Sequence, residues 1–537
     1  MALLRIHRHM FALLGVLVFS CLATSAEIPK VVQKDGRYAL LVDGQPYLML
    51  GAQIHNSSAW PRMLPQVWDA VKFISANTVE APIYWEQLEP KPGQFDFTNV
   101  DTLVRQAREN NVRLVLLWFG TWKNGAMHYT PEWIKTDTVR YPRIINANGQ
   151  KMDILSAHSQ PNLDADSKAF SALMRHLKEI DGNQYTVIMV QVENEAGHYG
   201  TVRDFSPAAQ ELFDSAVPAE LVTALRKQRG TWKQVFGADA DESFAAYSIA
   251  HYIDQVAAAG KAEYALPMYV NVALRDPEDA NARPGANYPS GGPTHNVLDL
   301  WIQTAKHIDA IGPDIYLNGD KKYGKVLSLY ARADNPLFVP ETSNAPANAK
   351  YLFSALGLGA IGFAPFGVDR TGYSNAPLGA DTTDKTMLPF ADNYRLLKPF
   401  AREIAELNFE GKLKTAVEEK GTPRKSIDFG KWQVMVSYGL PQFGFGTNPP
   451  GNPDAEGRAL VAQLSADEFL VTGFDARVDF ELAPSITEKK MQYIRVEEGV
   501  YENGDWKFLR IWNGDQTDWG LNFKSSPQVL RVKLGTY

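Results

Sequence analysis

Two glutamates, Glu195 and Glu341, lie far apart in the chain, and each follows an apolar run. The runs are Val187 to Glu195 and Pro336 to Thr342. Continuous runs rich in branched aliphatic residues are typical of parallel strands buried on both faces, so each carboxyl group should lie at the carboxyl end of a strand. Enzymes with parallel sheets and barrels carry their chemistry at these ends. Two carboxyl groups facing one pocket, one protonated and one ionised, are sufficient to cleave a glycosidic bond.

Taken alone, either glutamate could instead cap a helix or pair with an arginine. Their occurrence at matching strand ends, with Asn194 directly before the first, favours a shared site. Glu193 competes with Glu195 because it lies two residues earlier and should point to the same face of the strand. For Glu193 we expect a supporting contact or an ion pair in the core.

The elements that would position these residues alternate between strand-like apolar runs and longer amphipathic stretches, as in a parallel sheet. Eight runs are found: 47–54, 77–85, 113–122, 187–195, 267–274, 308–317, 336–342 and 360–367. Helices are expected between them over 67–75, 100–110, 167–180, 242–264, 298–305 and 347–356. The pattern predicts an α/β fold, a (β/α)₈ TIM barrel over residues 27–390, with the two glutamates on strands four and seven.

The pattern changes after Gly367. A helix-like stretch at 392–407 is followed by short runs with alternating polarity at 432–438, 459–464, 468–472, 477–482, 491–498, 506–512 and 529–534. Residues 391–537 are therefore predicted to form a connecting helix and a C-terminal all-β sandwich or jelly-roll domain. We expect a structural role for this domain; packing against the barrel, rimming the pocket and independent sugar binding are the alternatives.

The amino-acid composition limits the classes of partner that the protein is expected to bind. The 537 residues include 54 basic and 61 acidic side chains, for a net charge of -7, and no polybasic stretch follows the amino terminus. Nucleic acid is therefore not an expected partner. Aromatic residues make up 11% of the chain, which suits sugar-stacking clefts and a large core equally well.

The amino terminus has the pattern of a signal peptide over residues 1–26. Arg5 and Arg8 precede an apolar run at 11–22 and a small-residue cleavage site ending at Ala26. The run is too short for a membrane-spanning helix of about 20 residues, and no later segment comes closer. We therefore expect an exported protein, periplasmic or secreted. Cys21, the sole cysteine, offers an alternative as the acylated residue of an outer-membrane lipoprotein.

Several motifs resemble those of family 35 β-galactosidases, within the clan of (β/α)₈ glycosidases that use paired glutamates. The segment at 81–97, APIYWEQLEPKPGQFDF, looks like the family's strand-two signature, and QVENE at 191–195 resembles its strand-four block. The resemblance implies a retaining glycoside hydrolase in which Glu195 is the acid/base and Glu341 the nucleophile. It also implies that Asn194 contacts the sugar 2-hydroxyl and that Tyr316 hydrogen-bonds the nucleophile.

The chain departs from the family pattern in three places. After the strand-one histidine, residues 56–58 read NSS where the family has Tyr-Pro-Arg. Glu86 and Leu88 replace the family's Asn and His in the strand-two signature, and 119–125 reads FGTWKNG where the family has a Cys-Ala-Glu type segment. Contacts after strand three therefore cannot be transferred. Candidate sugar contacts from their strand-end positions are Tyr84, Gln53, Trp118, Trp122 and Trp133, although core packing explains any one aromatic equally well.

No metal or other cofactor is expected. His55, His128 and His198 lie near strand ends, but they lack a metal-ligand spacing such as HExxH. The segment 357–362 matches GxGxxG by letter, but it precedes a strand, whereas a dinucleotide-binding loop follows one.

By resemblance, the substrate is a carbohydrate, from which terminal non-reducing β-D-galactose is removed by exo attack on plant polysaccharide or oligosaccharide side chains, for instance xyloglucan. Another retaining glycosidase of the clan, such as an endo-β-glucanase or β-mannanase, is the alternative. A non-catalytic carbohydrate-binding barrel is a third reading, disfavoured by the presence of both glutamates. The sequence does not specify an oligomeric state.

Overall fold

The computed structural model describes residues 27–441, 448–487, 489–502 and 504–537. The expected signal peptide at 1–26, with Cys21, lies outside these residues. Within the described part of the chain, no helix is both long enough and apolar enough to cross a membrane.

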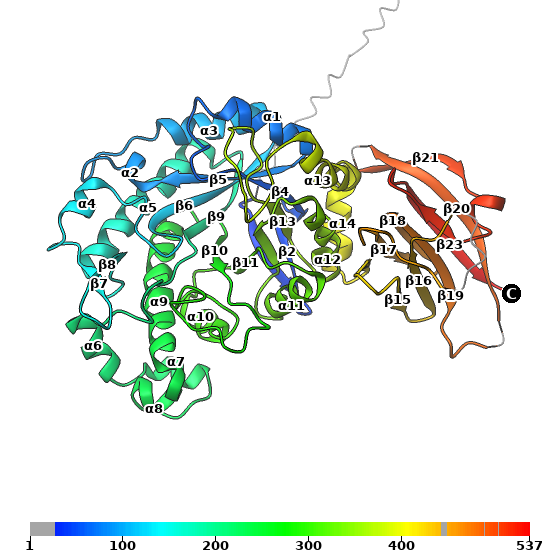
Figure 1. The fold of residues 1–537 in the computed structure, drawn as a ribbon. Coiled ribbons are helices and arrows are strands. Elements are labelled where there is room, and N and C mark those ends of the chain that lie inside the picture. Colours follow the sequence, from blue (N-terminus) through cyan, green and yellow to red (C-terminus); the bar gives the residue numbers. More distant parts are fainter. Residues whose placement is uncertain (1–26, 442–447, 488, 503) are drawn as a thin grey trace, which may run out of the picture.

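Eight parallel strands close into a barrel, as predicted from the apolar runs (Figure 1). In chain order they are β4 (Met49–Gln53), β5 (Thr78–Tyr84), β6 (Arg113–Lys123), β9 (Val187–Asn194), β10 (Met268–Ala273), β11 (Ala310–Ile315), β12 (Phe338–Thr342) and β13 (Gly362–Pro365). All eight residues of β9 are buried, which explains why the run carries no polar alternation. Asn194 ends the fourth barrel strand and Glu341 lies near the end of the seventh.

Helices cover the outside of the barrel. The six predicted segments correspond to α1 (Leu64–Ile74), α3 (Thr98–Glu109), α5 (Gln160–Asp181), α9 (Ala240–Glu263), α10 (Leu298–Thr304) and α12 (Tyr351–Gly357). A seventh, α11 (Asp320–Tyr330), was not predicted, because its polar first turn and Gly324 weaken the helical signal. Its buried face, formed by Tyr323, Val326, Leu327 and Tyr330, nevertheless follows helical spacing.

Smaller elements decorate the barrel. An antiparallel sheet formed by β1 (Lys30–Lys34), β2 (Arg37–Val42) and β3 (Gln45–Tyr47) precedes it. The remaining short elements lie in the connections: α2 (Trp85–Leu88), α4 (Glu132–Thr136), β7 (Arg143–Ile145), β8 (Lys151–Leu155), α6 (Pro207–Asp214), α7 (Ala219–Ala224) and α8 (Trp232–Phe236).

Two helices connect the barrel to the C-terminal domain. They are α13 (Asp384–Leu397) and α14 (Ala401–Phe409), separated by a 3-10 turn at Lys398–Phe400. The sequence predicted one stretch at 392–407; Pro399 interrupts it because proline donates no backbone hydrogen bond. Helix α13 runs across the domain boundary predicted at 390.

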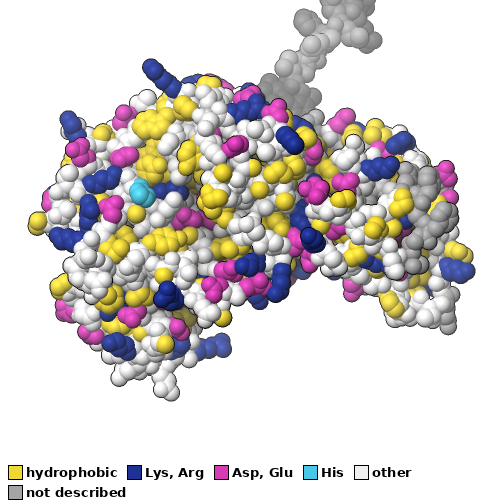
Figure 2. Space-filling view, viewed as in Figure 1, with side chains coloured by type: hydrophobic (Ala, Val, Ile, Leu, Met, Phe, Trp, Pro, Cys, Tyr) yellow, Lys and Arg dark blue, Asp and Glu magenta, His cyan; other side chains and the backbone are white. Residues whose placement is uncertain are grey.

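The C-terminal domain is a sandwich of two antiparallel sheets, as predicted. One sheet contains β14 (Leu413–Val417), β17 (Arg458–Ser465), β18 (Glu468–Phe474), β20 (Met491–Glu502), β21 (Asp505–Ile511) and β23 (Val529–Thr536); the other contains β15 (Arg424–Phe429), β16 (Trp432–Tyr438), β19 (Ala476–Leu482) and β22 (Leu521–Phe523). Side chains of both sheets, among them Trp432, Phe469 and Leu530, form its core. On the face drawn in Figure 2, basic and acidic side chains are interspersed over both domains.

Candidate active site

A cavity of about 840 Å³ opens at the carboxyl ends of the barrel strands. Glu195 and Glu341 both line it, together with Lys123 at the end of β6 and Tyr316 after β11. The loop after β13 supplies part of the wall, including Tyr373. Residues from distant parts of the sequence therefore meet where barrel enzymes place their chemistry.

Glu341 is held by two donors. Tyr316 Oη donates to Glu341 Oε1 at 2.5 Å, and Gln53 Nε2 donates to Glu341 Oε2 at 2.8 Å. Burial, followed by the nearby Glu341 carboxylate, raises the pKa of Tyr316 well above its usual value, so this hydroxyl stays protonated as a donor. Both oxygens of Glu341 thus accept hydrogen bonds that fix the carboxylate in place.

Glu195 is tied to the neighbouring strands through its backbone. Its N–H donates to Asn271 Oδ1 at 2.8 Å, and Asn271 Nδ2 donates to Asp314 Oδ2 at 2.7 Å. Burial, and secondly repulsion from Glu341, raises the pKa of the Glu195 carboxyl to about 7, although Lys123 and Asp314 act in the opposite direction. Glu195 can therefore carry a proton near neutral pH, as a general acid must.

Asp314 adds a third carboxyl group that the sequence reasoning passed over. One oxygen from each of Glu195, Asp314 and Glu341 lies within 4.8 Å of the others. Burial, with further repulsion from Glu341 and Glu195, raises the pKa of Asp314 well above its usual value. These three carboxyl groups are the residues that could ligate a cation. Their mutual repulsion, which promotes protonation, accounts for the cluster equally well without a metal. The expectation that no metal binds stays a prediction.

Asn194 and Lys123 form a buried pair beside the glutamates. Lys123 Nζ donates to Asn194 Oδ1 at 2.8 Å, and Asn194 Nδ2 has no acceptor among the described residues. The amide therefore has an unpaired donor one residue before Glu195. Asn194 itself is fully buried behind the residues that line the cavity, and its contact with a sugar hydroxyl stays a prediction. The only sequence signal for Lys123 was its position after the apolar run of β6.

Glu193 does not share a face with Glu195, contrary to the expectation from strand alternation. Both residues have a positive φ, 64° for Glu193 and 45° for Glu195, so the regular two-residue alternation ends there. Glu193 Oε2 accepts from the backbone N–H of Trp122 at 2.6 Å. Burial, with the adjacent Asp166 carboxylate, raises the pKa of Glu193 well above its usual value. Glu193 thus supports the core through a hydrogen bond, and no ion pair to it is found within the described part of the chain.

Four predicted sugar contacts are not part of the cavity wall. Trp118 and Trp122 are fully buried, and Trp118 Nε1 donates to Asp166 Oδ1 at 2.9 Å. Trp133 Nε1 donates to the carbonyl of Glu89 at 3.1 Å. Tyr84 is stacked between Trp60 and Tyr129, one layer behind the cavity. Gln53 reaches the site through Glu341, and Tyr316 lines the cavity directly.

His55 anchors the loop that follows β13. Its ring Nδ1 lies 3.0 Å from Asp369 Oδ2, and Nε2 lies 2.6 Å from Asn375 Oδ1. Burial would raise the pKa of Asp369, but the hydrogen bond and charge of His55 outweigh it and lower that pKa. His55 is therefore a structural residue of the cavity rim. Nothing in the sequence of this loop marked it as part of the site.

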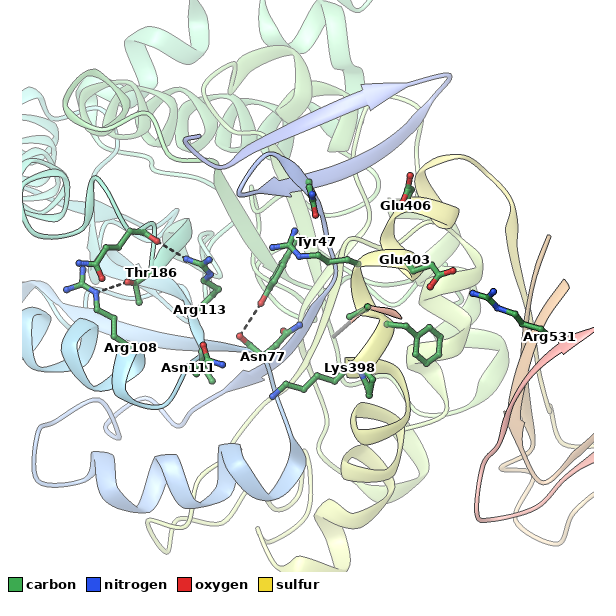
Figure 3. Close-up of a pocket in the computed structure, with 18 residues that line it drawn as sticks. Tyr47, Asn77, Arg108, Asn111, Arg113, Thr186, Lys398, Glu403, Glu406 and Arg531 are labelled. Atoms are coloured by element: carbon green, nitrogen blue, oxygen red, sulfur yellow. Dashed lines mark hydrogen bonds between the residues drawn. The ribbon is translucent and has the colours of Figure 1, made fainter. Parts of the chain in front are cut away.

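A larger cavity, about 990 Å³, lies at the amino ends of the strands, against the helices that lead to the sandwich (Figure 3). Two of its arginines form hydrogen bonds to the segment that precedes β9. Arg108 donates to Thr186 Oγ1 at 2.9 Å, and Arg113 donates to the carbonyl of Tyr185 at 2.7 Å. The amino face of a barrel generally serves stability. We assign this cavity to the seam between the domains.

The fold and site together define a (β/α)₈ barrel with two glutamate side chains facing one cavity at its carboxyl face. Residues 39–263 match the model of glycosyl hydrolases family 35, and residues 390–524 match that of a domain of unknown function, DUF5597. This match confirms the resemblance seen in the motifs of strands two and four.

The relatives that match are distant. A β-galactosidase from Xanthomonas manihotis is 30% identical over 169 residues, covering 29% of this chain and 25% of the relative. A human β-galactosidase is 30% identical over 177 residues, covering 30% and 23%. The chain thus spans about a quarter of the length of these relatives. A solved β-galactosidase from Bacillus circulans superposes with a TM-score of 0.47 and 14% identity, covering 66% of this chain and 57% of that one.

Proposed function

We propose that this chain is a retaining, exo-acting β-galactosidase that removes terminal non-reducing β-D-galactose from plant polysaccharide or oligosaccharide side chains. The observation that carries the proposal is the pairing of Glu195, with a pKa of about 7, and Glu341, held by two hydrogen-bond donors, across one cavity. The family 35 domain and its β-galactosidase relatives support the choice of sugar. The expected signal peptide supports an exported enzyme.

The spacing of the carboxyl groups favours retention. Retaining glycosidases hold the two groups roughly 5 to 5.5 Å apart, whereas inverting enzymes need roughly 6.5 to 9.5 Å to admit a water molecule. Oxygens of Glu195 and Glu341 lie within 4.8 Å of each other. Glu341 attacks the anomeric carbon while Glu195 protonates the leaving oxygen; Glu195 then deprotonates the water that releases the sugar. Tyr316 and Gln53 keep the attacking oxygen oriented.

The proposal is tested with a panel of nitrophenyl β-glycosides, comparing the wild type with Glu341→Ala and Glu195→Ala. We expect the galactoside to be the preferred substrate and Glu341→Ala to abolish turnover, with azide restoring glycosyl-azide formation in the glutamate variants. Azide is the appropriate probe because it replaces the missing nucleophile or the activated water. Preference for a glucoside or mannoside, or full activity in either variant, would contradict the proposal. Endo-acting cleavage within polysaccharides would then be tested next.

The pH profile supplies a separate test of the acid. Since Glu195 must be protonated for the first chemical step, kcat/KM should fall as the pH rises through about 7. A profile of kcat/KM for a poor leaving group, such as the methyl galactoside, measures this limb. A flat profile from pH 5 to 9 would show that Glu195 is not the acid.

A further inference from the structure

We propose that Lys123 is a positioning residue that fixes the Asn194 amide so that its N–H donors face the 2-hydroxyl of the bound sugar. The inference rests on the proposed function and concerns the segment after strand three, where this chain departs from its family. Lys123 lines the cavity, yet its side chain is only about 5% exposed.

The backbone brings Lys123 to Asn194 through a bulge. Trp118 pairs with Val192, and the next pair is Lys123 with Asn194, so five steps along β6 match two along β9. A regular register would place Gly120 opposite Asn194, with no side chain to offer. The irregularity therefore delivers an ammonium group to this position.

The chemistry of the pair sets the orientation of the amide. A lysine ammonium only donates, so the atom of Asn194 that it contacts at 2.8 Å must be the carbonyl oxygen. The amide nitrogen then points away from Lys123, and it has no acceptor among the described residues. A buried donor without a partner is unfavourable in the free protein, so an incoming hydroxyl that accepts from it gains an interaction that nothing else uses.

Lys123 also acts on the charge of Glu195. The groups that face Glu195 are Glu341 on β12, Asp314 on β11, Tyr199 in the following loop and Lys123 on β6. Among them Lys123 is the cation, and it lowers the pKa that burial and Glu341 raise. Removing the ammonium should therefore move the upper limb of the pH profile to higher pH.

The test compares the wild type with Lys123→Met on nitrophenyl galactoside and its 2-deoxy analogue. We expect Lys123→Met to lower kcat/KM for the galactoside by about tenfold or more, with a much smaller loss on the 2-deoxy sugar. Lys123→Arg keeps the positive charge, so the upper limb of its pH profile should return to the wild-type position. Lys135→Met is the matched control, because Lys135 contacts Glu86 and the carbonyl of His128 and does not line the cavity.

A double-mutant cycle separates this role from direct contact with the sugar. If Lys123 acts through Asn194, Lys123→Met should cause little further loss at the pH plateau in an Asn194→Ala background. Equal losses on both sugars, or an undiminished loss in that background, would overturn the proposal, as would an unshifted pH limb in Lys123→Met. An inactive wild type would instead contradict the proposed function. Unchanged circular dichroism of each variant establishes that it folds.

Discussion

At the scale of single residues, the site is a set of acids with different surroundings. The Glu341 carboxylate accepts two hydrogen bonds, whereas burial and a neighbouring carboxylate raise the pKa of Glu195. Two carboxyl groups made different by their environment are what acid and nucleophile roles require. Sequence reasoning identified the pair because both end apolar runs. It missed Asp314 and Lys123 because their roles depend on contacts between neighbouring strands.

The raised pKa of Glu195 has a consequence for stability. Between its ordinary pKa near 4.5 and about 7, the unfolded chain loses this proton while the folded chain keeps it, so stability contributed by the site falls as the pH rises. Glu195→Gln cannot ionise. We therefore expect the free energy of unfolding of Glu195→Gln minus that of the wild type to be about 1–2 kcal/mol larger at pH 8 than at pH 5, so that the variant is relatively more stable at the higher pH.

Urea denaturation of both proteins at the two pH values measures this difference. Glu109→Gln provides the control, because Glu109 is 56% exposed and paired on the surface with Arg105. A difference between Glu195→Gln and wild type that does not change with pH would show that Glu195 titrates normally in the folded protein.

At the scale of elements, the end of β6 decides the shape of the site. The run of apolar residues predicts the strand, but not the bulge after Trp118 or the positive φ angles at Glu193 and Glu195. Trp118 lies in the regular part of the strand and Trp122 within the irregular part, and both are fully buried away from the cavity. Periodic patterns identify regular strands well; a bulge is set by packing between strands, which the pattern of one strand does not contain.

A substitution at Gly120 tests the role of the bulge in β6, and a substitution at Gly324 in α11 serves as its comparison. A Cβ atom at Gly120 would lie 2.3 Å from Trp118 Nε1 and 2.8 Å from Glu193 Oε1, so Gly120→Ala should destabilise the protein by about 1–3 kcal/mol and lower activity. Gly324 lies within α11 with nothing within 4 Å of such an atom, so Gly324→Ala should stabilise by about 0.5–1 kcal/mol. Thermal melting measures the stability of both variants. If Gly120→Ala leaves the melting temperature unchanged, the bulge tolerates a side chain at this position.

At the scale of the whole molecule, buried cations join the barrel to the sandwich. Lys350, before α12, donates to the carbonyls of Glu418 and Ala455 at 3.0 and 2.8 Å and contacts Asp320 Oδ1 at 2.7 Å. Arg458 of the sandwich donates to Asn393 Oδ1 of α13 at 3.0 Å. The predicted structural role of the C-terminal domain agrees with these contacts.

Lys350→Met would leave two carbonyls and a carboxylate without their partner. We expect the wild type to unfold in a single calorimetric transition, and Lys350→Met to lose about 2–4 kcal/mol, with this transition moving to lower temperature or splitting into two. Lys321→Met is the control, because Lys321 is 87% exposed. If the wild type already unfolds in two separate transitions, the seam does not couple the domains.

In the proposed mechanism, Glu341 forms a covalent bond to the sugar while Glu195 supplies the proton. The most direct measurement is mass spectrometry of the protein after incubation with a 2-deoxy-2-fluoro-β-galactosyl fluoride, which slows release of the intermediate. We predict one fluorodeoxygalactosyl group per chain, carried by the peptide that contains Glu341 and absent from Glu341→Ala. A label on another residue, or its persistence in Glu341→Ala, would contradict the assignment of the nucleophile.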